Sequence, residues 1–161
     1  AGRVAPSPSD DGNVMHYITM STFGNSSDFG DLTEEHYASG TAANATRGLV
    51  FGARNFGAPA QSNMIDYVTI ASLGNAIRFG ELGKSNTPYA SYNGTGLASP
   101  TRAVYCGGYG PPAATYVSNT TMDYVQIMST GNAIDFGDLS QAVRGAAGMS
   151  NGHGGLSLIH I

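Results

Sequence analysis

The chain has 161 residues, of which 41% are hydrophobic and only 11% charged, with a net charge of −4. Lys84 is the single lysine and no basic cluster exists, which argues against a nucleic-acid partner because phosphate contacts need grouped lysines and arginines. No apolar run approaches the roughly 20 residues of a membrane-spanning helix, and the lone Cys106 excludes a disulfide within the chain.

A motif with a tyrosine, a Gly-Asn pair and a Phe-Gly pair occurs three times, in residues 15–32, 65–82 and 122–139. The 23 glycines indicate many tight turns between short strands. A repeat of roughly 40–50 residues built from short strands is typical of a β-propeller blade. We therefore predict an all-β fold in one repeat domain, residues 1–156, with repeats around 14–54, 64–108 and 121–156.

In the first repeat, the sequence predicts a polar loop over residues 5–13, followed by strands. Residues 14–22 are apolar on both faces, which indicates a strand buried between two neighbouring sheets. Gly24-Asn25 then predicts a two-residue hairpin with a type II′ turn. The next strand carries Phe29-Gly30, where the ring would fill space and the glycine would let another backbone approach.

The rest of each repeat predicts two further strands. Residues 36–44 are mostly small, and residues 46–52 are apolar and end in glycine; residues 101–108 repeat the second pattern. Small residues suit strands that crowd near a propeller axis. The segments 55–63 and 109–120 vary between repeats and follow the same strand. Loop insertions at one point of a repeat usually lie on one face, often the binding face.

This order of features resembles kelch repeats. Val104–Gly108 resembles the family's apolar run and Gly-Gly pair, Tyr124 its tyrosine and Arg144 its arginine, while Phe136 stands where the family carries tryptophan. The chain departs from the family in having no tryptophan and only one complete Gly-Gly of this kind. The tyrosine-to-leucine motif also resembles kelch-like repeat proteins of marine bacteriophages and environmental bacteria.

The resemblance implies about three four-stranded antiparallel propeller blades. Propellers close with typically four to eight blades, so we interpret the chain as a fragment of a larger propeller. Its partners would be further blades of the same or another chain. Residues 157–161 match nothing in the repeats and resemble the translation of an adapter used in preparing sequencing libraries, although an ordinary apolar tail is the alternative.

Several residues with possible chemistry also have simpler structural interpretations. Tyr105-Cys106 invites comparison with the copper site of galactose oxidase, but the four histidines are scattered, so a packing thiol is the better interpretation. His16 aligns with Asp66 and Asp123, which suggests an exposed position. Charged pairs flanking the Phe-Gly motifs could ring a cation or satisfy turn amides: Asp28 with Asp31, Arg78 with Glu81, and Asp135 with Asp138. We expect no catalytic site, metal or cofactor.

Four tyrosines lie in or beside the variable segments: Tyr89, Tyr92, Tyr109 and Tyr116. Tyrosine on loops offers a large contact area at low entropic cost, so these residues are candidates for binding a glycan or protein receptor. The alternative is that they pack their own loops onto the sheets.

Three functions follow as hypotheses. The first is a non-enzymatic structural or adhesive component of a phage virion, in the tail, neck or fibre, that displays loops for attachment. The second is a secreted or surface bacterial propeller that binds glycans or proteins. The third is a fragment of a propeller enzyme of the oxidase or sialidase type. The first two place the protein on a virion or outside the cell.

Overall fold

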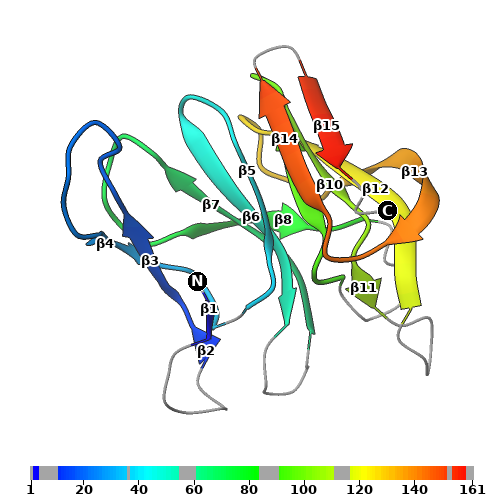
Figure 1. The fold of residues 1–161 in the computed structure, drawn as a ribbon, viewed down its shortest axis with the longest axis horizontal. Coiled ribbons are helices and arrows are strands. Elements are labelled where there is room, and N and C mark those ends of the chain that lie inside the picture. Colours follow the sequence, from blue (N-terminus) through cyan, green and yellow to red (C-terminus); the bar gives the residue numbers. More distant parts are fainter. Residues whose placement is uncertain are drawn as a thin grey trace.

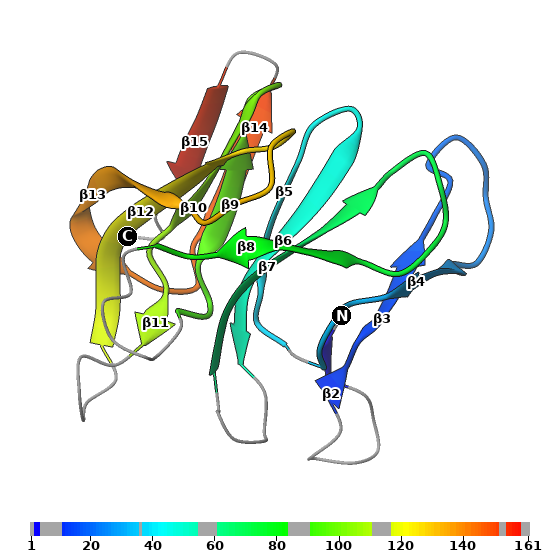
Figure 2. The ribbon, with the colours of Figure 1, turned by 180° about the vertical axis from the view of Figure 1, so that it is seen from behind.

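The computed structural model describes residues 2–3, 11–35, 37–54, 61–83, 91–110, 117–151 and 154–158. Over these residues the chain forms fifteen β-strands and no helix, and every strand pairing is antiparallel (Figures 1 and 2). The prediction of an all-β chain built from antiparallel sheets is therefore confirmed.

The strands form four successive sheets and a short N-terminal pair. The pair is β1 (Gly2–Arg3) with β2 (Asp11–Gly12), and the first sheet is β3 (Val14–Tyr17) with β4 (Ser27–Asp31). The second sheet has the order β5 (Gly40–Ala43), β6 (Arg47–Arg54), β7 (Gln61–Thr69) and β8 (Ile77–Glu81). The third contains β9 (Thr95–Ala98), β10 (Arg102–Cys106), β11 (Tyr109–Gly110), β12 (Val117–Gln126) and β13 (Ile134–Val143). The fourth is β14 (Ala147–Asn151) with β15 (Gly154–Leu158).

Each complete sheet combines halves of two consecutive sequence repeats. Strands β5 and β6 come from the predicted repeat 14–54, whereas β7 and β8 come from the repeat 64–108. They join because the tyrosine strand β7 pairs with β6, with Leu49 opposite Tyr67. Strands β10 and β12 pair in the same way, with Val104 opposite Tyr124. A sheet is thus completed only when the next repeat has been added.

One aromatic contact recurs in the three hairpins that join a tyrosine strand to a Phe-Gly strand, which are β3–β4, β7–β8 and β12–β13. Edge-to-face ring pairs join Tyr17 to Phe29, Tyr67 to Phe79 and Tyr124 to Phe136, with centroids 6.2, 5.9 and 5.9 Å apart. In the two complete sheets an arginine at the start of the strand paired with the tyrosine's own strand covers the ring: Arg47 lies 4.4 Å from the Tyr67 ring centroid and Arg102 5.2 Å from that of Tyr124. This packing explains why the tyrosine and phenylalanine repeat together.

The hydrophobic core lies between the second and third sheets. Phe51, Ile65 and Ile127 have no exposed surface, and the Phe51 ring packs 5.8 Å from the Tyr105 ring, which joins β6 to β10. These side chains come from the apolar strands that the sequence predicted, and they bury the faces that the two sheets turn toward each other.

Successive sheets are connected by a backbone joint that the Gly-Asn pairs form. Between the first and second sheets, the Gly74 N–H donates to the Phe29 carbonyl at 2.8 Å, and the Ala76 N–H donates to the Asp31 carbonyl at 2.7 Å. The Asp31 N–H donates in return to the Asn75 side-chain oxygen at 3.1 Å. We call this set of three hydrogen bonds the Gly-Asn joint.

The same joint connects the second sheet to the third. The Gly131 N–H donates to Phe79 at 2.9 Å, the Ala133 N–H to Glu81 at 2.7 Å, and the Glu81 N–H to the Asn132 side-chain oxygen at 3.1 Å. The two joints use equivalent atoms, and their hydrogen-bond lengths agree to within 0.1 Å. They agree because every contact uses backbone atoms or the asparagine amide. The repeated Gly-Asn and Phe-Gly pairs are therefore the two halves of one connection.

A β-bulge at each phenylalanine makes the joint possible. In β8, Gly80 lies opposite Ile65 and Arg78 opposite Asp66, so Phe79 between them has no partner in the pairing register. The phenylalanines of β4 and β13 are skipped in the same way. A bulge leaves one residue outside the ladder, and the Phe79 carbonyl is thereby free to bond the next sheet. The adjacent Gly80 is needed because a Cβ there would clash with the Gly131 carbonyl.

This geometry corrects the predicted two-residue hairpin. Strand β7 ends at Thr69 and β8 begins at Ile77, so Gly74-Asn75 lies in a longer loop whose turn is closed by a hydrogen bond from the Ser72 N–H to the Thr69 carbonyl at 3.2 Å. The prediction was wrong because it treated the Gly-Asn pair as a local turn, whereas the pair bonds a neighbouring sheet.

Two burial predictions also need correction. The strand expected over residues 14–22 ends at Tyr17 and is largely exposed, since β3 pairs with β4 alone among the described residues. His16 is exposed as expected, but Asp66 at the equivalent position is only 1% exposed. Its carboxylate accepts hydrogen bonds from the N–H and hydroxyl of Thr33, with lengths of 3.0 and 2.7 Å. A buried carboxylate is tolerated when such donors satisfy it.

Strands β5, β9 and β14, each at an edge of its sheet, lie side by side (Figure 2). A Cβ on Gly40 would lie 2.7 Å from the Tyr105 ring, and one on Gly148 would lie 2.6 Å from the Thr95 hydroxyl. A Cβ on Gly96 would clash with the Thr41 carbonyl. The small residues that the sequence shows in this part of the repeat are therefore required by the close approach of strands from different sheets.

Candidate functional site

The strand ends that flank the variable segments lie at one end of the sheets. Strand β6 ends at Arg54, β7 begins at Gln61, β11 ends at Gly110 and β12 begins at Val117. In Figure 1 these ends lie together at the bottom, opposite the β5–β6 and β14–β15 turns. The described strand ends within or beside the variable segments 55–63 and 109–120 thus lie at the same end of the molecule, which is the place to look for a binding surface.

Two of the predicted tyrosines meet near this end. Tyr92 and Tyr109 form an isolated antiparallel bridge: the Tyr109 N–H donates to the Tyr92 carbonyl at 2.7 Å, and the reverse bond measures 3.2 Å. Their rings pack edge to face with centroids 5.6 Å apart. Tyr92 is only 5% exposed and Tyr109 is half-buried. Tyr92 therefore packs inside the fold, and Tyr109 retains some surface.

An arginine covers each of these rings. The Arg54 guanidinium carbon lies 5.3 Å from the Tyr92 ring centroid, and one Arg54 N–H group donates to the Tyr92 hydroxyl at 3.4 Å. The exposed Arg144 lies 4.3 Å from the Tyr109 centroid. We call these four residues the tyrosine–arginine cluster. The Arg54 Nε atom is buried and has no hydrogen-bond partner among the described residues.

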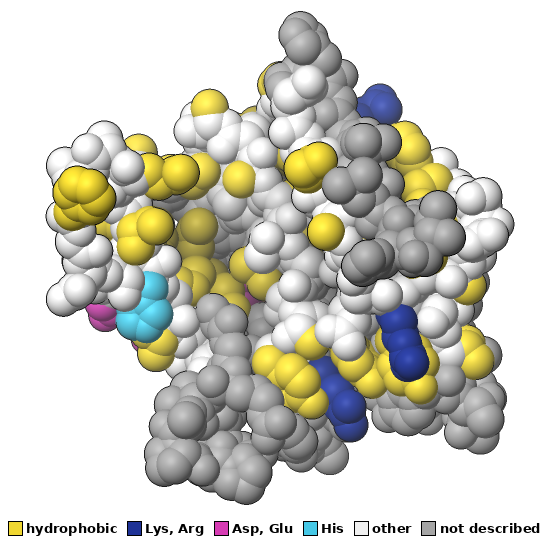
Figure 3. Space-filling model, in the orientation of Figure 1, with side chains coloured by type: hydrophobic (Ala, Val, Ile, Leu, Met, Phe, Trp, Pro, Cys, Tyr) yellow, Lys and Arg dark blue, Asp and Glu magenta, His cyan; other side chains and the backbone are white. Residues whose placement is uncertain are grey.

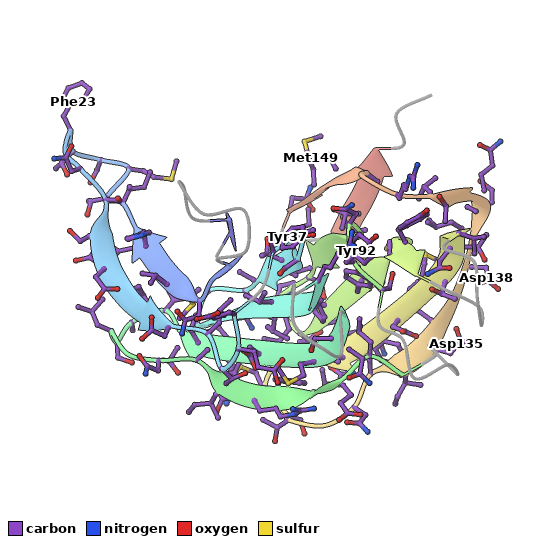
Figure 4. The ribbon with its side chains drawn as sticks, turned by 90° about the horizontal axis from the view of Figure 1, so that it is seen from below. Phe23, Tyr37, Tyr92, Asp135, Asp138 and Met149 are labelled. Carbon is purple, nitrogen blue, oxygen red and sulfur yellow. The ribbon has the colours of Figure 1, made fainter. Side chains whose placement is uncertain are left out.

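The cluster offers chemistry suited to a polar ligand. Arg144 is exposed and carries guanidinium N–H donors, and it lies over the half-buried Tyr109 ring. A cation beside an aromatic ring can bind sugars or carboxylates. Figure 4 shows Tyr92 in the middle of the structure. Of the four predicted tyrosines, the structure brings Tyr92 and Tyr109 together, whereas Tyr89 and Tyr116 lie outside the described residues.

Sequence analysis did not place Arg54 and Arg144 in a binding site. Arg54 ends the strand immediately before a variable segment, and its backbone pairs with Tyr37 through bonds of 2.9 and 3.0 Å. Arg144 was identified only by its resemblance to the kelch arginine. For Arg54, a cation at the start of a variable segment was the available signal. The stacking partners of Arg54 and Arg144 lie 38 and 35 residues away in sequence and appear only in the fold.

Tyr105 and Cys106 are held in unreactive forms. Burial raises the pKa of Tyr105 to about 12 and that of Cys106 to about 11. The Tyr105 hydroxyl donates to the Ser91 carbonyl at 3.2 Å and accepts from the Gly94 N–H at 3.1 Å. Because neighbouring residues in a strand point to opposite faces, the phenol and thiol do not share a site. Cys106 is 1% exposed, which agrees with the packing role expected from the sequence.

The charged pairs beside the Phe-Gly motifs serve local contacts. The carboxylates of Asp28 and Asp135 accept from the N–H groups of Gly30 and Gly137 at 3.1 and 3.0 Å. Arg78 and Glu81 form an ion pair at 2.7 Å. The described part of the chain holds no group of three or more histidine, cysteine, aspartate or glutamate residues placed to share a metal. Asp28 and Asp135 therefore satisfy backbone amides of their own strands, and Arg78 and Glu81 satisfy each other.

A shallow polar hollow occurs in the loop of the first hairpin. Its lining combines hydroxyl, amide and backbone groups from Tyr17, Thr19, Thr22, Gly24, Asn25 and Ser27. It contains no titratable group other than the tyrosine and is formed by one hairpin alone, so it offers no second element to enclose a small molecule.

The described residues contain no helix long and apolar enough to cross a membrane. A scan against protein-family models and a search of curated proteins found no match to this chain.

Proposed function

We propose that this protein is a non-enzymatic structural and adhesive protein whose sheets are kelch-like β-propeller blades and whose variable loops attach to a receptor. The observation that carries the proposal is the combination of a repeated rigid joint with loops that leave the sheets from one end. A framework that repeats its backbone contacts can hold sheets in fixed positions while the loops vary, which is how binding loops are usually supported.

The propeller part of the proposal is supported by the order of the strands. Each complete sheet is antiparallel with its small-residue strand at one edge, and β5, β9 and β14 from three successive sheets lie next to one another. Radial repetition of four-stranded sheets about a common axis would bring inner strands together in this way. The kelch resemblance of the sequence agrees with this arrangement.

The attachment part is supported by the tyrosine–arginine cluster. Arg144 and Tyr109 expose a cation and an aromatic ring at the end from which the loops depart. We propose a glycan or protein receptor as the ligand, with the protein acting as a tail, neck or fibre component of a phage virion. The virion assignment is supported by the resemblance to marine phage repeat proteins and by the scarcity of charged residues, and it places the protein on a virion or outside the cell.

An array of bacterial surface polysaccharides and outer-membrane proteins tests the attachment. We expect the purified chain to bind a subset of the array. The variant Arg144→Ala should weaken that binding about tenfold, because a hydrogen bond to a charged group contributes roughly 1.5–3 kcal/mol. The matched control is Arg102→Ala, which removes an arginine that also stacks on a tyrosine, Tyr124, but at the strand end away from the variable loops.

Equal binding by the two variants, or no binding to any array component, would overturn the attachment proposal. Sequencing the source DNA on both sides of the reading frame tests the virion part. Neighbouring tail or capsid genes are expected, whereas an export signal with host surface genes would favour a secreted bacterial propeller instead.

A further inference from the structure

The two ends of the molecule carry unused halves of the Gly-Asn joint. Within the chain the joint is made twice, and each time a Phe-Gly-acidic segment on one sheet accepts a Gly-Asn segment from the next. The third sheet presents another such segment, Phe136-Gly137-Asp138, on β13. The first hairpin presents another Gly-Asn segment, Gly24-Asn25-Ser26. Figure 4 shows Phe23, which precedes Gly24, and Asp138 at opposite ends of the structure.

The accepting half on β13 is open among the described residues. Phe136 is 50% exposed, whereas Phe79, which a joint covers, is 4% exposed. The nearest atom to a Cβ on Gly137 would be the Met122 methyl carbon at 3.8 Å, whereas the equivalent position at Gly80 is filled by the third sheet. The bulge that turns the Phe79 carbonyl outward is also present at Phe136.

The donating half on the first hairpin is also open. Gly24, Asn25 and Ser26 are exposed, whereas Ala76 and Ala133, which occupy the position of Ser26 in the two joints, are 8% and 7% exposed. Apolar side chains surround this segment: Ile18 is 64%, Met20 94% and Phe23 107% exposed. In Figure 3 such side chains are visible over the first hairpin at the left of the molecule. A surface of this kind marks a contact site.

The fourth sheet has an open strand edge next to the open joint. Strand β15 pairs with β14 alone among the described residues, whereas its equivalents β6 and β10 each pair with a tyrosine strand on their other side. The hairpin turns align the strands: Asn151 opposite Gly154 corresponds to the turns closed by Asn44 with Arg47 and by Ser99 with Arg102. Among the described residues, strand β15 therefore has no tyrosine strand on its other edge.

Strand β3 is a tyrosine strand that lacks the complementary partner. Strands β7 and β12 continue two residues beyond their tyrosines, to Thr69 and Gln126, where they pair with the starts of β6 and β10. Strand β3 stops at Tyr17, and its pairing within the described chain is with β4. The alignment of the turns places Tyr17 opposite Leu156 and Ile18 opposite Gly155 in a completed sheet.

We propose that the β3–β4 hairpin of one copy of this chain completes the fourth sheet of a second copy. In the same step β3 pairs with β15, and Gly24-Asn25-Ser26 forms the Gly-Asn joint with Phe136-Gly137-Asp138. The two contacts are mutually consistent because, inside the chain, the hairpin that completes a sheet is also the hairpin that bonds the preceding sheet. The occupant is a second copy because one chain carries both halves.

The contact joins different surfaces, so it is heterologous and either closes into a ring or propagates. The described residues of each chain form two complete sheets, and each contact between copies would complete one more. Two copies closed head to tail would therefore contain six sheets, which lies within the typical range of four to eight for propellers. We infer a closed dimer with twice the 16.5 kDa mass of the chain.

Light scattering after size-exclusion chromatography tests the association. We expect a dimer at micromolar concentration, and the variant Asn25→Ala, which removes the side-chain acceptor for the Asp138 N–H, should raise the dissociation constant about tenfold. The matched control Asn75→Ala removes the same hydrogen bond inside the chain and should lower the melting temperature without a comparable change in dissociation constant. A monomer at every concentration would overturn the proposal, and so would equal dissociation constants for the two variants.

Disulfide trapping tests the register even where a variant folds poorly. One preparation carries Ile18→Cys and the other Gly155→Cys, a position whose equivalent in the third sheet is Ala103 and therefore accommodates a side chain. Paired Cα atoms in an antiparallel sheet are about 4.5–5.5 Å apart, within the range of a disulfide. We expect a cross-linked heterodimer on mild oxidation, and none when the first partner carries Ser72→Cys, an exposed loop position. Equal cross-linking of both pairs would refute the register.

Discussion

The substitution Gly80→Ala tests the Gly-Asn joint through the sign of its effect. Gly80 is not in the positive-φ region, so alanine suits its backbone and would ordinarily stabilise the chain by about 0.4–1 kcal/mol through the unfolded state. In the folded chain the added Cβ would clash with the Gly131 carbonyl and lie 3.0 Å from the Asn132 nitrogen. Both are backbone atoms, so the third sheet's loop must move away.

The expected decrease in the free energy of unfolding depends on which contacts of the Gly-Asn joint are broken when the loop moves. Overpacking costs about 1–3 kcal/mol, and each of the three hydrogen bonds in the joint contributes about 0.5–1.5 kcal/mol. If the loop withdraws, the three hydrogen bonds are lost and the clash is relieved. We therefore expect the free energy of unfolding to decrease by about 3 kcal/mol. For a chain of this size that lowers the melting temperature by about 6–12 °C.

Urea unfolding followed by circular dichroism measures the effect. The matched control is Gly24→Ala, where a Cβ would meet no atom within 4 Å, and it should leave the free energy of unfolding of the monomer unchanged or raise it slightly. Because Gly24 belongs to the proposed contact between copies, both variants are compared at concentrations at which the chain is monomeric. A Gly80→Ala variant as stable as the parent would refute the joint.

Three further predictions concern stability and reactivity. Replacing Thr33 by alanine removes the hydroxyl donor to the buried Asp66 carboxylate, and we expect a loss of about 1–3 kcal/mol in urea unfolding; an unchanged midpoint would contradict the role of this contact. Because burial raises the pKa of Cys106 from 9.0 to about 11 and that of Tyr105 from 10.0 to about 12, the unfolded state loses these protons first as the pH rises. The free energy of unfolding should therefore be constant with respect to these two groups below pH 9 and decrease above it, by about 1.4 kcal/mol per pH unit for each titrating group. The variant Cys106→Ala should remove the decrease between pH 9 and 10. A free energy of unfolding that does not change with pH in the parent would contradict the pKa shifts. Iodoacetamide at pH 8 should modify Cys106 in urea but not in the native protein, as mass spectrometry would show, and rapid native modification would contradict its burial.

The sequence was sufficient to predict the repeat, the all-β class and the close approach at the Phe-Gly pairs. These features depend on side-chain size and spacing within about 20 residues. The ring beside the glycine predicted that another backbone would come close at Gly30 and Gly80, and the Gly-Asn loops of the following sheets lie at both places.

The residues that contact each other between sheets were not predictable from local sequence patterns. Gly74-Asn75 has the composition of a two-residue turn, but its N–H group and amide bond a strand more than 40 residues earlier. Asp66 was expected at an exposed position because a carboxylate avoids burial, yet Thr33 from the first sheet's end satisfies it. Tyr92 was a candidate for solvent contact, and Arg54 and Tyr109 from distant strands enclose it. In each case the deciding contact lies between sheets.

Amide hydrogen exchange measured by NMR on the dilute monomer tests the central claim that the Gly-Asn pairs bond successive sheets. The account predicts slow exchange at Gly74 and Gly131, whose N–H groups bond Phe29 and Phe79. It predicts fast exchange at the equivalent Gly24, whose proposed acceptor belongs to a second copy. Equally fast exchange at all three glycines would show that the loops do not join the sheets, and would contradict both the internal joint and the association built on it.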